Sequence, residues 1–333
     1  MRRLIQPSFL LCLGLLALVE IFLRCTLSPL AVAAFQYGYH PDSGFQETAD
    51  GLVHLVPGPT RDFHAQTFSR TRPPGGFRIF TLGSSVEYWD AKASHVLSNT
   101  YPARLESELR RRGLNAESIN LAVTGYGTLH NEVLLRQALT YQPDLIIFKL
   151  DVTNEGTDAI RAERAREFTS FWPQDWLWKS YLVQIGLQWK EAELMSRTLP
   201  LHNLTGNSAP AGKLEAIQSA GAAPFTATSR QALVECLQLA RRQGVPVLLV
   251  TQAYVTRDAA GSVLVTDHGL DAFAAAFCGS GVRMLSFTQL FGRLPVADNF
   301  VDQVHLTRPA HQFVAQALAE AVSAMPRRPA PDQ

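Results

Sequence analysis

Two serines directly follow an apolar run of strand length. The run covers residues 77–82, and Gly83 separates it from Ser84 and Ser85. A glycine lets the chain turn sharply, and a hydroxyl placed after such a turn projects from the edge of a sheet, where it can act as a nucleophile. Ser85 is therefore a candidate nucleophile, although phosphate-binding turns and plain structural turns have the same local sequence.

An aspartate and a histidine lie three residues apart near the C-terminal end. Asp302 and His305 come just before a helical pattern at residues 309–325. On a loop or short turn, this spacing brings the carboxylate against the imidazole and fixes the tautomer whose other nitrogen takes a proton from serine. Read singly, Asp302 is a helix-capping or surface residue and His305 a partly buried polar residue.

A glycine and an asparagine follow two further apolar runs. Gly125 comes after residues 118–123, and Asn154 comes after residues 145–150. A glycine leaves its backbone N–H open to a reacting carbonyl, and an asparagine amide adds a side-chain donor, so the pair is suited to holding an oxyanion. Both are also ordinary turn residues.

Strand-like apolar runs and helical patterns alternate along the chain. The apolar runs cover residues 77–82, 118–123, 145–150, 245–251 and 282–287, and the helical patterns cover residues 101–112, 132–141, 229–243, 270–278 and 309–325. Because the runs are apolar throughout, they predict a sheet of about five parallel strands between two helical layers, a three-layer α/β/α fold. Ligands of such sheets bind beyond the carboxyl ends of the strands, where Ser85, Gly125 and Asn154 are expected.

Four segments in this order resemble sequence blocks of the SGNH (GDSL-type) hydrolases. Residues 78–85, 120–125, 143–155 and 302–307 are similar to the first, second, third and fifth blocks, and the likeness covers roughly residues 78–154 and 302–318. The resemblance implies a flavodoxin-like fold with a Ser85–His305–Asp302 triad. It also implies an oxyanion hole made of the backbone N–H groups of Ser85 and Gly125 and the amide of Asn154, with no cofactor and no metal.

The sequence departs from that family at three places. Ser84 stands where aspartate is usual, and it is the alternative nucleophile. The segment 151–153 reads Asp-Val-Thr where glycines are frequent, and Glu155 replaces the usual aspartate.

The resemblance implies a serine esterase that hydrolyses O-acyl esters, and three readings of its function stay open. A tethered extracytoplasmic location favours short-chain esters on carbohydrate or envelope components, with an acylated carbohydrate, lipid or other small ester as the substrate. The same site could serve a carbohydrate O-acetyltransferase, and the chain could be a catalytically inactive, membrane-tethered binding module. A net charge of +1 and the lack of long basic runs argue against a nucleic-acid partner. The oligomeric state is not readable from the sequence.

The first 34 residues predict a membrane segment. Arg2 and Arg3 precede a largely apolar stretch at residues 4–23, long enough to cross a bilayer and oriented by the arginines with its N-terminus in the cytoplasm. The sequence Ala-Val-Ala at residues 31–33 also resembles a signal-peptide cleavage site, in which case the protein is secreted. We favour an uncleaved anchor, and either alternative places the remainder outside the cytoplasm, in the bacterial periplasm or at the cell surface.

The remaining segments divide the 333-residue chain further. Residues 35–76 predict an irregular or short-stranded lead-in, residues 77–326 the hydrolase-like domain with an insertion at 159–227, and residues 327–333 a disordered tail. The insertion carries Trp172, Trp176 and Trp178, which either pack it onto the domain or line a sugar- or lipid-binding surface. Cys236 and Cys278 either form a disulfide or are two buried thiols.

Overall fold

The computed structural model describes residues 7–26, 44–56, 63–91, 94–156, 158, 180–183, 225–257 and 262–325, and the statements that follow concern these residues. The predicted tail at 327–333 and most of the predicted insertion at 159–227, with its three tryptophans, lie outside them.

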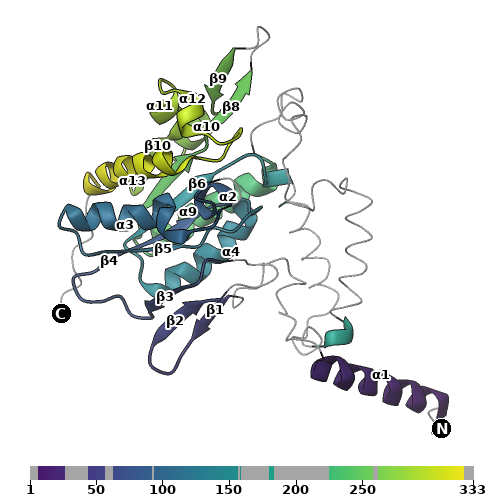
Figure 1. Cartoon of the computed structure of the whole chain (residues 1–333). Coiled ribbons are helices and arrows are strands. Elements are labelled where there is room, and N and C mark those ends of the chain that lie inside the picture. Colours follow the sequence, from purple (N-terminus) through teal and green to yellow (C-terminus); the bar gives the residue numbers. More distant parts are fainter. Residues whose placement is uncertain are drawn as a thin grey trace.

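A five-stranded parallel sheet forms the centre of the structure (Figure 1). Its strands are β4 (Phe77–Leu82), β5 (Ala116–Asn120), β6 (Leu145–Leu150), β7 (Val247–Thr251) and β10 (Val282–Ser286). They lie in the order β10-β7-β6-β4-β5, and each neighbouring pair is parallel. The chain thus starts the sheet at β4, adds β5 on one side and the later strands on the other, which is the flavodoxin-like order.

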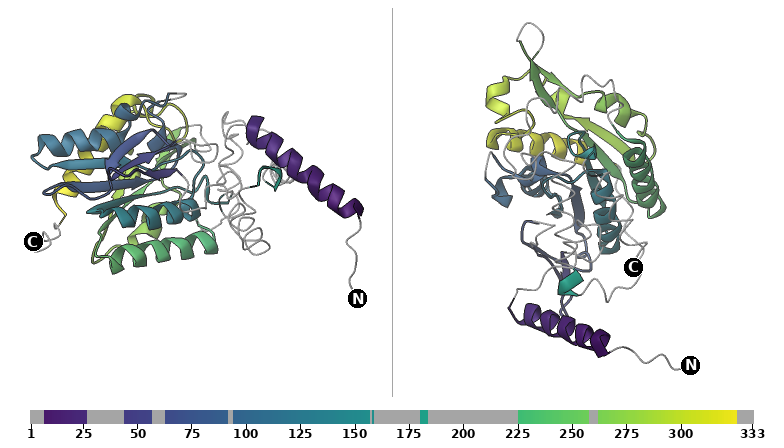
Figure 2. Two further views of the ribbon diagram at one scale, coloured as in Figure 1. Left: turned by 90° about the horizontal axis from the view of Figure 1, so that it is seen from below. Right: turned by 90° about the vertical axis from the view of Figure 1, so that its right-hand side faces the viewer.

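Helices cover both faces of this sheet (Figure 2). The helices α4 (Thr128–Ala138) and α9 (Ala227–Arg242) pack together over one face, and α3 (Tyr101–Arg111) and α13 (Arg308–Ser323) pack together over the other. Side chains alternate along each strand, so Phe80 joins the α4–α9 core and Ile79 joins the α3–α13 core. The predicted three-layer α/β/α fold with five parallel strands is confirmed.

Smaller elements surround the three layers. They are the strands β1 (Phe45–Glu47), β2 (Leu52–Leu55), β3 (Gln66–Ser69), β8 (Tyr254–Arg257) and β9 (Val263–Thr266), the helices α2 (Ser85–Tyr88), α10 (Leu270–Ala275), α11 (Phe287–Phe291) and α12 (Val296–Asn299), and the 3-10 turns η2 (Leu97–Asn99) and η3 (Leu139–Tyr141). The first three strands form an antiparallel sheet within the predicted lead-in. The β8–β9 hairpin was not predicted.

The boundaries of β5 and α4 and the exposure of one cysteine differ from the sequence predictions. Strand β5 covers residues 116–120 rather than 118–123, because its N-terminal residues pair with the start of β4. Helix α4 begins at Thr128, four residues before the predicted start, because carboxyl groups from a distant segment cap its first N–H groups. Cys236 and Cys278 are both free thiols, and Cys236 is buried whereas Cys278 is exposed.

An apolar helix, α1 (Pro7–Thr26), lies outside the layered domain (Figure 1 and Figure 2). Its residues 8–26 are long and apolar enough to cross a membrane, a criterion that a signal sequence meets equally well.

Candidate active site

Ser85 is the first residue of α2, directly beyond the carboxyl end of β4. Strand β4 lies between β5 and β6, at the point where the strand order reverses, so the loops after all three strands meet beside Ser85. Gly83 fits this turn because the Glu87 carboxylate fills the space of a side chain: a Cβ at Gly83 would lie 2.2 Å from Glu87 Oε2. Glu87 Oε2 accepts a hydrogen bond from the Ser84 N–H at 2.8 Å and so caps the short helix.

The structure brings Ser85, His305 and Asp302 together in one hydrogen-bonded chain. Ser85 Oγ lies 2.8 Å from His305 Nε2, and His305 Nδ1 lies 2.7 Å from Asp302 Oδ2. The second carboxylate oxygen, Oδ1, accepts from the backbone N–H groups of Val304 and His305 at 2.9 and 2.8 Å. This arrangement lets Nε2 accept the serine proton while Nδ1 donates to the carboxylate.

The electrostatics of Asp302 favour its charged form. Partial burial raises the pKa of Asp302, but the hydrogen bond and charge of His305, together with the two backbone N–H donors, outweigh burial and hold this pKa below its usual value. A carboxylate that stays ionised can stabilise the imidazolium that forms when His305 takes a proton.

Ser84 lies in a different environment from Ser85. Its side chain is buried and its hydroxyl donates to Asp151 Oδ2 at 3.0 Å, whereas the hydroxyl of Ser85 is the one paired with His305. The geometry therefore favours Ser85 over the alternative nucleophile.

The two other sequence-predicted residues lie at the same edge of the sheet. Gly125 has a φ of 82° in the turn after β5, a left-handed conformation that favours glycine. Asn154 is half-buried in the segment after β6, and its Nδ2 donates to Asp151 Oδ2 at 3.3 Å. The amide thus points to a carboxylate of its own loop, and Gly125 makes no hydrogen bond to the triad among the described contacts.

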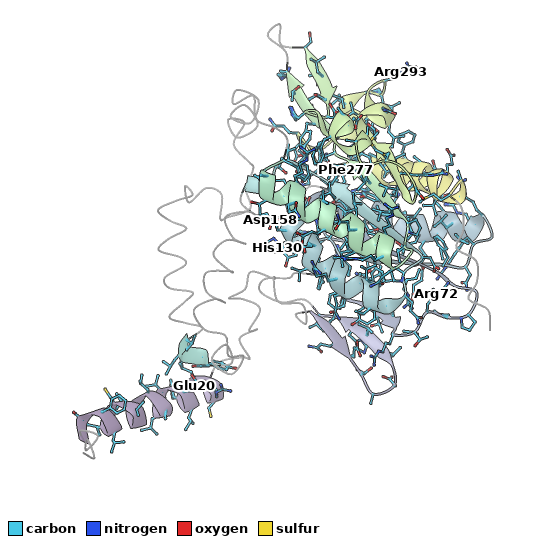
Figure 3. All side chains as sticks on the ribbon, turned by 180° about the vertical axis from the view of Figure 1, so that it is seen from behind. Glu20, Arg72, His130, Asp158, Phe277 and Arg293 are labelled. Atoms are coloured by element: carbon cyan, nitrogen blue, oxygen red, sulfur yellow. The ribbon has the colours of Figure 1, made fainter. Side chains whose placement is uncertain are left out.

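Two buried carboxyl groups join the loops that carry Gly125 and Asn154. Glu155 accepts from the N–H and the hydroxyl of Thr128 at 3.0 and 2.8 Å. Asp158 accepts from the N–H groups of Leu129 and His130, and its other oxygen contacts His130 Nδ1 (Figure 3). These bonds satisfy the first N–H groups of α4 and hold the segment after β6 against the start of that helix.

An aromatic side chain and an ion pair support the histidine loop, which is the segment that carries Asp302 and His305. The Trp89 ring stacks on the His305 ring with centroids 4.5 Å apart. The neighbouring Asp90 is fully buried and accepts from Arg308 Nε at 2.8 Å, which fixes the segment after α2 to the start of α13. Sequence reasoning missed both contacts, since nothing in the local sequence relates residues 89–90 to residues 305–308.

No group of three or more His, Cys, Asp or Glu residues in the described part of the chain has the geometry of a metal site.

Comparisons with known proteins give likenesses of fold. No family model and no curated protein sequence matches the chain. Among solved structures, a carbohydrate acetylesterase family member from Sinorhizobium meliloti is 14% identical with a TM-score of 0.41, over 74% of this chain and 97% of that one. The acetyl xylan esterase AlAXEase is 13% identical with a TM-score of 0.43, over 74% of this chain and all of that one. A lipolytic protein of the G-D-S-L family from Veillonella parvula is 12% identical with a TM-score of 0.41, over 75% of this chain and 100% of that one.

Proposed function

We propose that this chain is a serine esterase of the SGNH type that hydrolyses O-acyl esters. The observation that carries the proposal is the continuous chain of hydrogen bonds from Ser85 through His305 to Asp302 at the carboxyl end of β4. Serine alone is a weak nucleophile at neutral pH, and a paired imidazole is the usual means of activating it.

In the proposed reaction, His305 Nε2 takes the proton of Ser85 as Oγ attacks the ester carbonyl. The tetrahedral oxyanion is held by the backbone N–H groups of Ser85 and Gly125 and by the Asn154 amide, which turns from Asp151 to the substrate. His305 then gives its proton to the leaving alcohol, leaving an acyl group on Ser85. A water molecule, deprotonated by His305, releases the acid and restores the serine.

The proposed substrate is a short-chain acyl ester on a carbohydrate or an envelope component, because a membrane-tethered domain meets such esters outside the cytoplasm.

The contacts of α1 with the rest of the chain support an anchor that stays attached. Glu20 accepts from the Ser180 hydroxyl and from the N–H groups of Tyr181 and Leu182, each at 3.0 Å, and Arg24 lies over the Tyr181 ring. Cleavage after α1 would remove these partners. Mass spectrometry of the protein recovered from both the membrane and the soluble fractions tests this: a soluble protein with an N-terminus beginning near residue 34 would contradict the anchor.

The proposal is tested by measuring hydrolysis of acetyl and longer acyl esters by the full chain in detergent. Ser85→Ala should lower kcat/KM by more than about 10³-fold, since loss of a triad nucleophile leaves only background catalysis. Ser84→Ala is the matched control and should keep most of the activity, because the Ser84 hydroxyl donates to Asp151 and not to His305. Full activity in Ser85→Ala would contradict the proposal, and acyl products formed only with a carbohydrate acceptor would identify a transferase instead.

A further inference from the structure

A lysine lies in the middle of a strand that is otherwise apolar. All six residues of β6 are buried, and the side chain of Lys149 has no exposed surface. A buried ammonium group is costly to desolvate unless it is paired, so its partners explain how the fold accommodates it. Lys149 Nζ lies 3.3 Å from Glu87 Oε1, contacts Gln252 Oε1 and lies 4.9 Å from the centre of the Phe287 ring.

Glu87 connects this lysine to the turn at Gly83 and Ser84, which directly precedes the nucleophile Ser85. Its carboxylate is also fully buried, and its two oxygens have separate partners. Oε2 accepts from the Ser84 N–H, which starts the helix that carries Ser85, and Oε1 accepts from Lys149 and from the Tyr101 hydroxyl at 2.9 Å. The charge of Lys149 thus balances the carboxylate that holds the turn around the nucleophile.

Gln252 connects the lysine to the histidine loop. Its side chain is fully buried beyond the end of β7, and its Nε2 donates to the Val304 carbonyl oxygen at 3.0 Å. Val304 directly precedes His305, and its own N–H donates to Asp302. The position of the base therefore depends on a residue that is itself bonded to Lys149.

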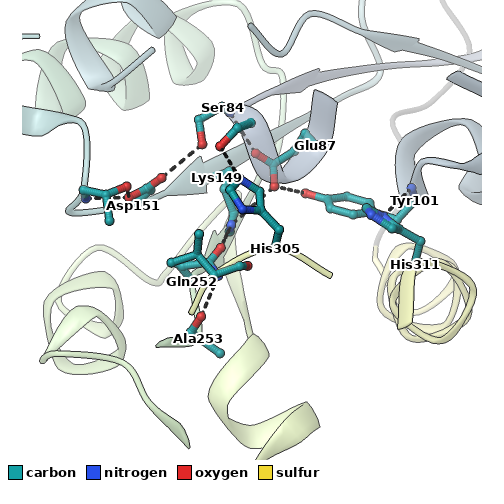
Figure 4. A network of polar contacts seen from close by, with 12 residues as sticks. Ser84, Glu87, Tyr101, Lys149, Asp151, Gln252, Ala253, His305 and His311 are labelled. Carbon is teal, nitrogen blue, oxygen red and sulfur yellow. Dashed lines mark hydrogen bonds and ion pairs between the residues drawn. The ribbon is translucent and has the colours of Figure 1, made fainter. Parts of the chain in front are cut away.

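These contacts form one buried path between the nucleophile and its base (Figure 4). The path runs from the Ser84 N–H through Glu87, Lys149 and Gln252 to the Val304 carbonyl. The three side chains on it come from three different elements, α2, β6 and the end of β7, and none has contact with solvent. Such a path can fix the distance between two catalytic groups without touching the substrate.

We propose that Lys149, together with Glu87 and Gln252, is a positioning unit that sets the Ser85–His305 geometry. This inference rests on the proposed function. The reacting pair is 2.8 Å apart, and a misplacement of about 1 Å costs up to about 10²-fold in rate. A purely structural ion pair makes a different prediction, namely a loss of stability with no specific loss of turnover.

The experiment measures kcat, KM and thermal stability of the full chain on a short-chain ester for four variants: two single substitutions, their combination and one control. Lys149→Met removes the charge with little change of volume, and Gln252→Met removes the bond to Val304 while leaving the Lys149–Glu87 pair intact. Each should lower kcat by about 10- to 100-fold with less than about a twofold change in KM. The rate of fluorophosphonate labelling of Ser85 should fall by the same factor.

Coupling between the two substitutions provides the sharpest readout. Because the two residues act through one path, Lys149→Met/Gln252→Met should be no slower than the slower single variant. Rate losses that multiply would overturn the proposal, as would single variants that are less stable but keep wild-type kcat. Ile147→Val, on the same strand, is the control for core disruption and should lower stability while leaving kcat unchanged.

Two further outcomes remain distinguishable. If Lys149→Met fails to fold, Gln252→Met alone decides, because it leaves the buried ion pair in place: wild-type kcat in that variant overturns the proposal. If the wild-type protein hydrolyses no ester, it is the proposed function that fails. An active wild type with unaffected Lys149 and Gln252 variants refutes only the positioning unit.

Discussion

Asp302→Asn is the substitution that most directly examines how the histidine is oriented. The asparagine keeps an Oδ1 that can accept from the N–H groups of Val304 and His305, so the loop should retain its conformation. Its amide nitrogen takes the place of the oxygen 2.7 Å from His305 Nδ1. A donor at that position forces the imidazole proton onto Nε2, which then can no longer accept the proton of Ser85.

The lost charge sets the smallest loss of activity expected in this variant. The charges of Asp302 and of the His305 imidazolium lie about 4 Å apart. Their attraction is about 4 kcal/mol in an effective dielectric of about 20, and about 2 kcal/mol in one of about 40. The higher dielectric accounts for screening by solvent, because the carboxylate side chain is 38% exposed. At 1.36 kcal/mol for each factor of ten, the lost charge alone lowers kcat/KM by about 30- to 1,000-fold, and the wrong tautomer adds to this loss.

The assay is ester hydrolysis by the full chain between pH 5 and 9, with the unfolding free energy measured in parallel. Asp298→Asn is the matched control, because it makes the same chemical change at an exposed residue of α12. The expected result is a large loss of kcat/KM in Asp302→Asn alone, with stability changed by less than about 1 kcal/mol. Activity within threefold of wild type would refute the role assigned to Asp302.

Two further predictions concern the loops after β5 and β6. Burial and the charge of Asp158 raise the pKa of Glu155 from 4.5 to about 8, so the stability that this protonated carboxyl contributes is complete below about pH 4.5 and is lost as the pH rises to about 8. Glu155→Gln, which stays neutral, should flatten the pH dependence of the unfolding free energy between pH 5 and 8, and an unchanged dependence in denaturant titrations would contradict this. Gly127→Ala should destabilise the fold by about 1 to 3 kcal/mol, because its Cβ would lie 2.7 Å from Asp158 Oδ2 in a fully buried region. Gly156→Ala, whose Cβ meets nothing within 4 Å, is the control, and equal effects of the two substitutions would show that the clash is relieved.

The parts of the fold that could be predicted from the sequence are those determined by local pattern. The run at residues 77–82 has apolar residues on both faces and ends at Gly83, and the structure has β4 at the same residues. The spacing of Asp302 and His305 likewise allows a side-chain contact within one short turn, and the structure contains that contact.

The parts that could not be predicted depend on residues distant in sequence. The start of α4 at Thr128 is determined by Glu155 and Asp158, which lie about thirty positions away in the chain. The strand pattern at residues 145–150 hides the role of Lys149, because a single lysine in an apolar run gives no sign of its partners. Its role depends on Glu87 and Gln252, 62 and 103 positions away, and only the packing of β6 beside β4 and β7 brings them together.

The most direct measurement is labelling of the full chain with a fluorophosphonate, followed by intact mass and peptide mapping. A serine activated by a paired histidine is the nucleophile that such a probe modifies. The account predicts a single adduct on Ser85 in the wild-type protein and none in a folded His305→Ala variant. A folded wild-type protein with no adduct, or with its adduct on Ser84, would contradict the proposed nucleophile.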